Sequence, residues 1–103
     1  MVVGSAYSVH HVPIRLTYER LYHITENHPE LAGRTYQLLE TISNPEFVVK
    51  GKRGEQIAAR KIDHRYLVVA YREEDNQGFI ITSFLTSKIH QIQQRPRIWP
   101  THN

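Results

Sequence analysis

The stretch Tyr66-Leu67-Val68-Val69-Ala70-Tyr71-Arg72 decides the fold that we expect for this chain. It is almost continuously apolar and rich in β-branched and aromatic residues, which is typical of a strand covered on both faces. We therefore place it in the middle of a sheet. A polar loop over residues 73–78 follows it, and the next apolar run, residues 79–85, predicts a neighbouring strand.

Two further strands are predicted before the central one. Phe47-Val48-Val49 reads as a strand, Gly51-Lys52-Arg53-Gly54 is typical of a hairpin turn, and residues 56–62 form the following strand. Connections this short usually join antiparallel neighbours. The second half of the chain is therefore expected to be a four-stranded antiparallel meander.

Two helices are predicted before the meander. Thr17 is a suitable N-cap and Glu19 suits the positive first turn, so the first helix begins there and ends before Pro29. A second, amphipathic helix follows and stops at Asn44-Pro45. Its inward side carries Leu31, Thr35, Leu38, Leu39 and Ile42. We expect an α+β fold in which both helices pack on one face of the meander and leave the other face open.

The length of 103 residues fits one domain. We assign the domain to residues 14–87, an N-terminal arm or edge strand to residues 1–13, and a basic, Gln-rich extension that ends in disorder to residues 88–103. The absence of cysteine excludes disulfides and thiolate metal sites. No apolar run approaches the ~18 residues of a membrane span, and no secretion signal is visible, so we expect a cytoplasmic protein without membrane contact.

Histidine and arginine are the residues that indicate chemistry. Imidazole exchanges protons near neutral pH and guanidinium holds phosphate, and together they can cleave a phosphodiester without a metal. The first helix ends in two imidazoles, His23 and His28. Strand alternation allows Arg60, Arg72, Thr82 and Thr86 to share the open face, provided that the register is the expected one. The formal charge of +3 also permits an acidic partner such as RNA.

Simpler interpretations stand beside this one. His23 is equally typical of a solvated helix surface, His28 of a helix end, and strand arginines of surface ion pairs. The basic hairpin tip with Lys50, Lys52 and Arg53 is a candidate RNA contact or a solvated turn. His23 and His28 are five residues apart, which does not match the i, i+4 spacing of a helical zinc pair. We expect neither a metal nor another cofactor.

The pattern of this chain resembles one known family. The segment Ile14–Glu30, with its His23-Ile24 and His28-Pro29-Glu30 elements, and the later strands up to Ser87 are similar to the phage barnase–EndoU–colicin–RelE-like nucleases. The resemblance implies a RelE/barnase-like fold and metal-independent cleavage of RNA to a 2′,3′-cyclic phosphate. By position it implies that His23 is the helix histidine, that Arg60 or Arg72 is the strand arginine, and that Thr82 is the strand hydroxyl.

A second hypothesis is a noncatalytic module that binds RNA or a protein through the open sheet face, a sheet edge or the Gln-rich tail. The partners expected under the two hypotheses are RNA, an antitoxin-like protein and a second copy of the chain. Geometry distinguishes the hypotheses. The enzyme requires that His23 or His28 approach the strand arginines and Thr82 across one cleft.

Overall fold

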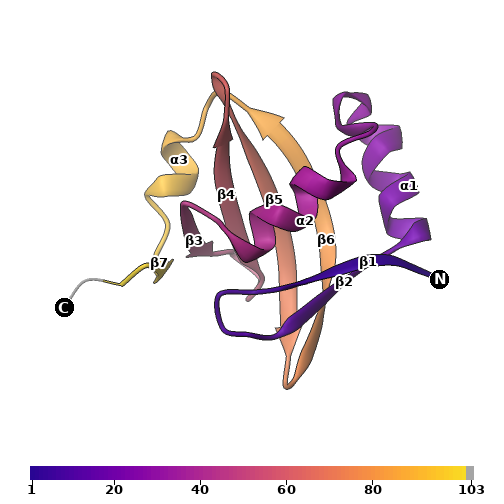
Figure 1. Ribbon diagram of the computed structural model, residues 1–103. Coiled ribbons are helices and arrows are strands. Elements are labelled where there is room, and N and C mark those ends of the chain that lie inside the picture. The colour runs from indigo at the N-terminus through magenta and orange to yellow at the C-terminus, as the bar shows by residue number, and fades with distance from the viewer. Residues whose placement is uncertain (102–103) are drawn as a thin grey trace.

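The protein is described by a computed structural model over residues 1–101. It contains a seven-stranded sheet, two helices packed on one face and a short third helix (Figure 1). The elements in chain order are β1 (Val2–Tyr7), β2 (Pro13–Thr17), α1 (Tyr18–Asn27), the 3-10 helix η1 (Pro29–Leu31), α2 (Thr35–Ser43), β3 (Phe47–Lys50), β4 (Gln56–Ile62), β5 (Arg65–Glu74), β6 (Gln77–Thr86), α3 (His90–Gln93) and β7 (Arg97–Trp99).

The strands are ordered β1-β2-β6-β5-β4-β3-β7 across the sheet. All neighbours are antiparallel except β2 and β6, which pair in parallel where Ile14 faces Gly78 and Arg15 faces Phe79. The parallel pair joins the N-terminal hairpin to the last long strand of the meander. Segments far apart in the sequence therefore meet at this line of the sheet.

The expected fold, two helices on a four-stranded meander of the RelE/barnase type, is wrong. Strand residues make up 45% of the protein and helical residues 26%, and the sheet is mixed. The four expected strands correspond to β3, β4, β5 and β6, but β1, β2 and β7 extend the sheet on both sides. The alternation of buried Ile14 and Leu16 with half-exposed Arg15 and Thr17 is a strand pattern that precedes the helix start, and its distant parallel partner leaves no local signal.

The start of α1 and the ends of α1 and α2 follow the expected signals. The expected second helix is divided, because Leu31 belongs to η1 and α2 begins only at Thr35. The Thr17 hydroxyl oxygen accepts a hydrogen bond from the backbone N–H of Arg20 at 3.1 Å, which caps α1. Helix α1 ends at Asn27, just before Pro29, and α2 ends just before Asn44-Pro45. These signals determine where α1 begins and where α1 and α2 end.

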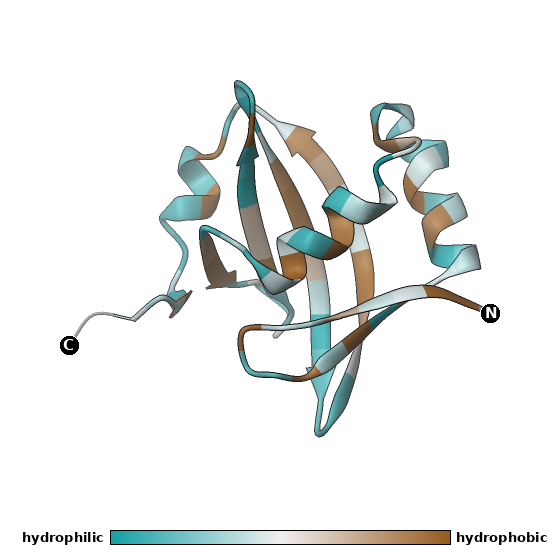
Figure 2. Cartoon of the chain, in the orientation of Figure 1, coloured by the Kyte–Doolittle hydropathy of each residue, from teal (hydrophilic) through white to brown (hydrophobic). Residues whose placement is uncertain are grey.

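The sheet has a helix face and an open face. The helix face is packed against α1 and α2, and its core includes Leu67, Val69 and Tyr71, whose side chains are fully buried. Figure 2 shows hydrophobic segments of the central strands behind α2. Val68 lies on the opposite face, which we call the open face, in a smaller cluster that α3 partly covers with Ile89 and Ile92. Tyr71 points inward, toward the helices.

The segments outside residues 14–87 also belong to the sheet. Of the two interpretations offered for residues 1–13, the structure has the edge strand, β1. The C-terminal extension forms α3 and then β7, which pairs with β3. The disorder expected at the end of the chain concerns residues 102–103, which lie outside the described residues. No helix among the described residues is long and apolar enough to cross a membrane.

Candidate functional site

The structure separates the two strand arginines named from the sequence. Arg60 pairs with Leu67 on the helix face, and its guanidinium donates a hydrogen bond to the backbone carbonyl of Asn44 at 2.6 Å. Arg72 pairs with Phe79 and belongs to the open face. The expectation that both arginines share one face is therefore wrong for Arg60, because it closes the end of α2 instead.

Thr82 and Thr86 share the open face with Arg72, as expected. Thr82 pairs with Ala70 and Thr86 pairs with Tyr66. Ala70 and Arg72 are two residues apart in β5 and therefore point to the same face, which Thr82 shares as the partner of Ala70. The open face therefore carries three of the four side chains assigned to it.

The two helix histidines lie in different surroundings. His23 is exposed on α1, and its nearest aromatic neighbour is Tyr22, at 6.3 Å between ring centroids. His28 lies at the edge of the open face with its ring 6.0 Å from that of Phe84, and its Nδ1 is 3.6 Å from a carboxylate oxygen of Glu30. No hydrogen bond or ion pair among residues 1–101 joins either imidazole to an arginine, so the catalytic roles assigned to them stay predictions.

The basic hairpin tip lies between β3 and β4. Lys50, Lys52 and Arg53 are all exposed there. The backbone carbonyl of Arg53 accepts a hydrogen bond from the Arg72 guanidinium at 3.0 Å, and the carbonyl of Lys50 accepts one from Arg95 at 2.7 Å. The tip is thus held by two further arginines and concentrates positive charge at this end of the sheet.

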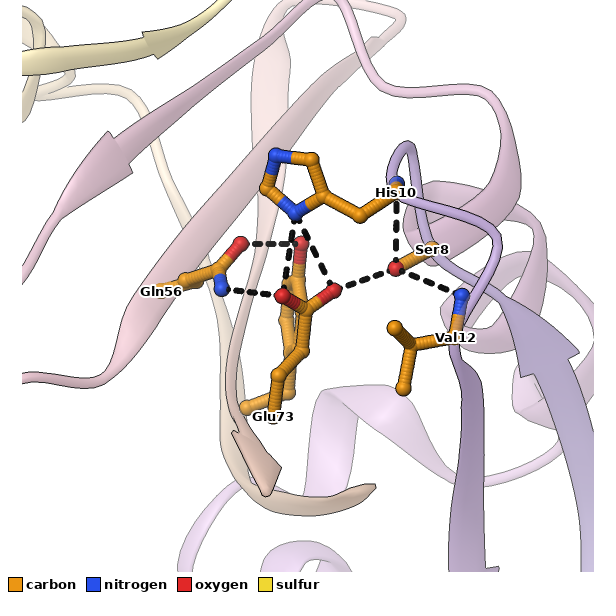
Figure 3. A network of polar contacts seen from close by, with 6 residues as sticks. Ser8, His10, Val12, Gln56 and Glu73 are labelled. Carbon is orange, nitrogen blue, oxygen red and sulfur yellow. Dashed lines mark hydrogen bonds and ion pairs between the residues drawn. The ribbon is translucent and has the colours of Figure 1, made fainter. Parts of the chain in front are cut away.

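A polar cluster that the sequence interpretation missed lies next to this tip (Figure 3). The Glu73 carboxylate is at its centre. It accepts hydrogen bonds from the Ser8 hydroxyl, from Nδ1 of His10 at 2.9 Å and from the side-chain amide of Gln56 at 2.6 Å. The Gln56 carbonyl oxygen in turn accepts a hydrogen bond from the Tyr71 hydroxyl at 3.1 Å. Three segments, the β1–β2 loop, β4 and β5, thereby meet around one carboxylate.

The loop between β1 and β2 presents His10 to Glu73. The Ser8 oxygen accepts hydrogen bonds from the backbone N–H groups of His10 at 3.2 Å and Val12 at 3.3 Å, and the Ser8 N–H donates to the Val12 carbonyl at 2.8 Å. His11 completes the turn with a positive φ of 64°. Ser8 therefore fixes both the loop and the carboxylate, which defines the position of the imidazole.

The electrostatics of the cluster keep Glu73 charged. Burial alone raises the pKa of the Glu73 carboxyl, but the hydrogen bonds from Ser8, Gln56 and His10 outweigh burial and hold the pKa below its ordinary value of 4.5. Burial, with a smaller effect from Glu73, raises the pKa of Tyr71 well above its ordinary value, so its phenol stays protonated and donates. The cluster is an anion held by neutral donors and one imidazole.

This arrangement leaves one ring nitrogen of His10 free for proton transfer. Nδ1 faces the carboxylate, whereas Nε2 points away from the network (Figure 3). The His10 side chain is 44% exposed and that of Glu73 is 14% exposed. A carboxylate at Nδ1 orients the ring and stabilises the imidazolium. The Ser8 hydroxyl donates to Glu73 rather than to the imidazole, so it is not arranged as a nucleophile activated by His10.

Within residues 1–101, no group of three or more His, Cys, Asp or Glu side chains is placed to hold a metal ion. His10 and Glu73 are joined to each other and to neutral donors.

The sequence held only weak signals for this cluster. His10 and Glu73 are 63 residues apart, and Gln56 comes from a third segment. Ser8 and His10 precede a strand that was not recognised, and Glu73 was assigned to a polar loop although β5 continues through it. The location of Glu73 directly after the strongest strand was the signal that could have singled it out.

The cluster predicts a dependence of stability on acidity. Because the pKa of Glu73 is lower in the folded protein than in the unfolded chain, its ionised form stabilises the fold above about pH 4.5. This stabilisation is lost as the pH falls through the folded-state pKa. We expect the melting temperature of the wild type to drop between about pH 5 and pH 3, and that of Glu73→Gln to start lower at pH 7 and drop less.

Thermal unfolding followed by circular dichroism at a series of pH values measures both curves. Glu55, whose pKa is lowered mainly by the hydrogen bond from the Arg53 backbone N–H, is present in both proteins, so only the difference between the curves reports on Glu73. Parallel curves for the two proteins would contradict the assignment.

Comparison of the chain with known protein families, with curated proteins and with solved structures gave no match.

Proposed function

We propose that the protein is a metal-independent endoribonuclease in which His10 transfers the proton. The observation that carries this proposal is the imidazole of His10, oriented by the Glu73 carboxylate at 2.9 Å. Gln56, which donates to that carboxylate, is the first residue of β4 and follows the basic hairpin tip with Lys52 and Arg53. A proton-transfer group next to a positive surface is the arrangement that phosphodiester cleavage requires.

The reaction begins at the ribose. Nε2 of His10 takes the proton of a 2′-hydroxyl, the 2′ oxygen bonds to the adjacent phosphorus, and the bond from phosphorus to the 5′ oxygen breaks. The 5′ oxygen takes a proton from solvent, so that the products are a 2′,3′-cyclic phosphate and a 5′-hydroxyl. Glu73 stabilises the imidazolium that forms, and the basic tip stabilises charge on the phosphate.

The likeness of residues 14–87 to the phage nuclease family supports the same reaction class, although the resemblance named His23 as the helix histidine. His10 is preferred because its ring is oriented by a partly buried carboxylate, whereas His23 is exposed without such a partner among the described residues. The proposed reaction is therefore the one that the resemblance implies, but the imidazole that transfers the proton is that of His10.

A noncatalytic RNA-binding module is the second candidate. The observation that favours it is that the same hydrogen bonds fasten the β1–β2 loop to β4 and β5, through Ser8 and Gln56. Such hydrogen bonds stabilise the fold whether or not a reaction takes place at the cluster. The two candidates share their ligand and differ in whether RNA is cut.

A cleavage assay in excess EDTA tests the proposal. We expect the purified protein to cut single-stranded RNA and to leave 2′,3′-cyclic phosphate ends, detected by mass spectrometry of the fragments. RNA of the same sequence with 2′-O-methyl groups should stay intact, because it has no nucleophile. RNA that remains whole at high concentrations of folded protein would support the noncatalytic module instead, and cleavage that EDTA stops would contradict the metal-independent route.

A further inference from the structure

A row of three side chains crosses the open face at the end of the sheet near the β5–β6 turn. Arg15 in β2 faces Phe79 in β6, and Phe79 faces Arg72 in β5. Strand partners point to the same face, so one aromatic ring lies between two arginines. The Arg15 guanidinium lies 5.8 Å from the centroid of the Phe79 ring, within the range of a cation–π contact. We call these three residues the arginine–phenylalanine row.

Within the described part of the chain, neither guanidinium group of the row is held in an ion pair. Among residues 1–101, no carboxylate lies within 4.0 Å of a guanidinium nitrogen of Arg15 or Arg72. The contacts of Arg15 are the carbonyl oxygens of Gly78 at 3.3 Å and Gln77 at 3.5 Å, and that of Arg72 is the Arg53 carbonyl at 3.0 Å. Neutral acceptors therefore orient both guanidinium groups and leave their charge available to an anion.

Acidic residues do occur near the row. Glu74 faces the exposed Gln77 two residues beyond Arg72 in β5, and Glu55 lies beside Arg72. The Glu55 carboxylate accepts a hydrogen bond from the backbone N–H of Arg53 at 2.8 Å. Glu55 directly precedes β4 and Glu74 is the last residue of β5, so the two acids lie at the β3–β4 and β5–β6 hairpins. The side of the row that faces α1 carries no carboxylate partner among the described residues.

A cavity of about 260 Å³ opens on that side of the row. It is lined by Arg15, Thr17, Arg20, Phe79 and Ile80. Arg20 is exposed in the first turn of α1, and the described residues form no side-chain hydrogen bond or ion pair with it. This volume is slightly below that of clefts that enclose whole small ligands. The cavity is therefore suited to one unit of a longer polymeric ligand. Two guanidinium groups and one aromatic ring therefore share one opening.

Further along the open face, other aromatic side chains are half-exposed. Phe84 lies on β6 and Tyr66 on β5, both on the same face as Phe79. Sheets that bind single-stranded RNA use this combination, in which bases stack on aromatic rings and phosphates contact cations. A flat protein partner would instead need a larger apolar area than these half-buried rings offer.

We propose that the arginine–phenylalanine row and the cavity beside it bind single-stranded RNA. Arg15, Arg20 and Arg72 contact phosphates, and the Phe79 ring packs against a base. This proposal rests on RNA as the ligand of the proposed function and extends it, because it names a binding surface apart from the His10 cluster. RNA that binds here approaches the end of β5, where Arg72 and Glu73 are consecutive residues on opposite faces.

The test is a binding titration with a fluorescent 2′-O-methyl RNA of mixed sequence, which the proposed reaction cannot cut. Fluorescence anisotropy gives the Kd at several salt concentrations. We expect Phe79→Leu to weaken binding on the order of tenfold, as the loss of one stacked base does. We expect Arg15→Gln and Arg72→Gln each to lower the salt slope by about 0.7, the value of one phosphate contact on a single strand.

Two variants make the result decisive. Arg65→Gln changes an exposed arginine at the other end of β5 and should bind like the wild type. Arg20→Gln should weaken binding without affecting the fold, because its side chain is exposed, so it serves even if Arg15→Gln unfolds. Wild-type affinity and salt slope in folded Arg20→Gln and Phe79→Leu would overturn the inference.

The binding titration and the cleavage assay distinguish this site from the proposed function. A wild-type protein that binds through the row but never cuts RNA would overturn the proposed function and support this site. A protein that cuts RNA as before when the row is changed, with unaltered Kd, would support the function and overturn this site.

Discussion

Replacing His10 with alanine should lower the rate of RNA cleavage about 10²–10⁴-fold, the usual contribution of a well-placed proton-transfer group. The imidazole is the one side chain of the cluster with a free nitrogen directed outward, and no neighbour in the network can take over its role. The rate should be measured under single-turnover conditions, so that binding and product release do not hide the chemical step. The melting temperature should change little, because the side chain is 44% exposed.

Two other histidines provide matched controls. His11→Asn changes the neighbouring imidazole and keeps a residue type that tolerates its φ of 64°. His23→Ala removes the histidine that the sequence favoured. Both variants should cleave RNA at nearly the wild-type rate. If His23→Ala lost activity and His10→Ala kept it, the assignment from the sequence would replace ours.

Glu73→Gln tests whether the carboxylate positions His10 for the reaction. The substitution removes the acceptor that orients the imidazole, so the single-turnover rate constant of cleavage should fall even in fully folded protein. A loss of folded protein alone would lower the amount of RNA cut in the single turnover and leave the rate constant unchanged. A wild-type rate constant in folded Glu73→Gln would contradict the role given to this carboxylate.

The largest effect on stability is expected from Gly78→Ala. Gly78 faces Ile14 on one side and Glu73 on the other, at the junction of β2, β6 and β5. A Cβ atom there would overlap the backbone carbonyl oxygen of Arg72 and lie 2.6 Å from Cδ1 of Ile14. Since a backbone atom must move, we expect a loss of about 3 kcal/mol, the upper part of the usual range for overpacking. For a domain of this size, the melting temperature should fall by roughly 12–24 °C.

Gly51→Ala is the matched control for this prediction. A Cβ atom at Gly51 would also overlap its surroundings, but the atoms it meets belong to the side chain of Glu55. A side chain can rotate away, whereas the backbone carbonyl beside Gly78 is fixed in the ladder between β5 and β6. Gly51→Ala should therefore cost much less. Equal losses of melting temperature in the two variants would contradict the backbone explanation.

Local signals in the sequence were sufficient for the meander and the helix ends. The apolar run at residues 66–72, the hairpin glycines and the Thr17 cap each act over a few residues, and the structure contains the corresponding elements. The parallel pairing of β2 with β6 depends on Ile14 and Gly78, which are distant in the chain. A short segment cannot reveal such a partner, so the fold class was wrong although its central part was present.

The candidate site shows the same limit. Alternation placed Arg72, Thr82 and Thr86 together, because these residues lie on neighbouring strands of the meander. Arg60 was misplaced because its face depends on the register of β4 against β5, which pairs it with Leu67 and cannot be read from either strand alone. The His10 cluster needed the unrecognised β1–β2 hairpin, so nothing local could join His10 to Glu73.

The long separation of His10 and Glu73 in the sequence also determines when a nascent chain can bring these two residues together. Synthesis delivers the N-terminal segment first, but His10 must wait for Glu73, 63 residues later, before its ring is oriented. Closure of so long a loop is slow relative to the formation of hairpins. A growing polypeptide on the ribosome therefore carries an unoriented imidazole until β5 and β6 have emerged, and the nearby messenger and ribosomal RNA meet the assembled group only after that point.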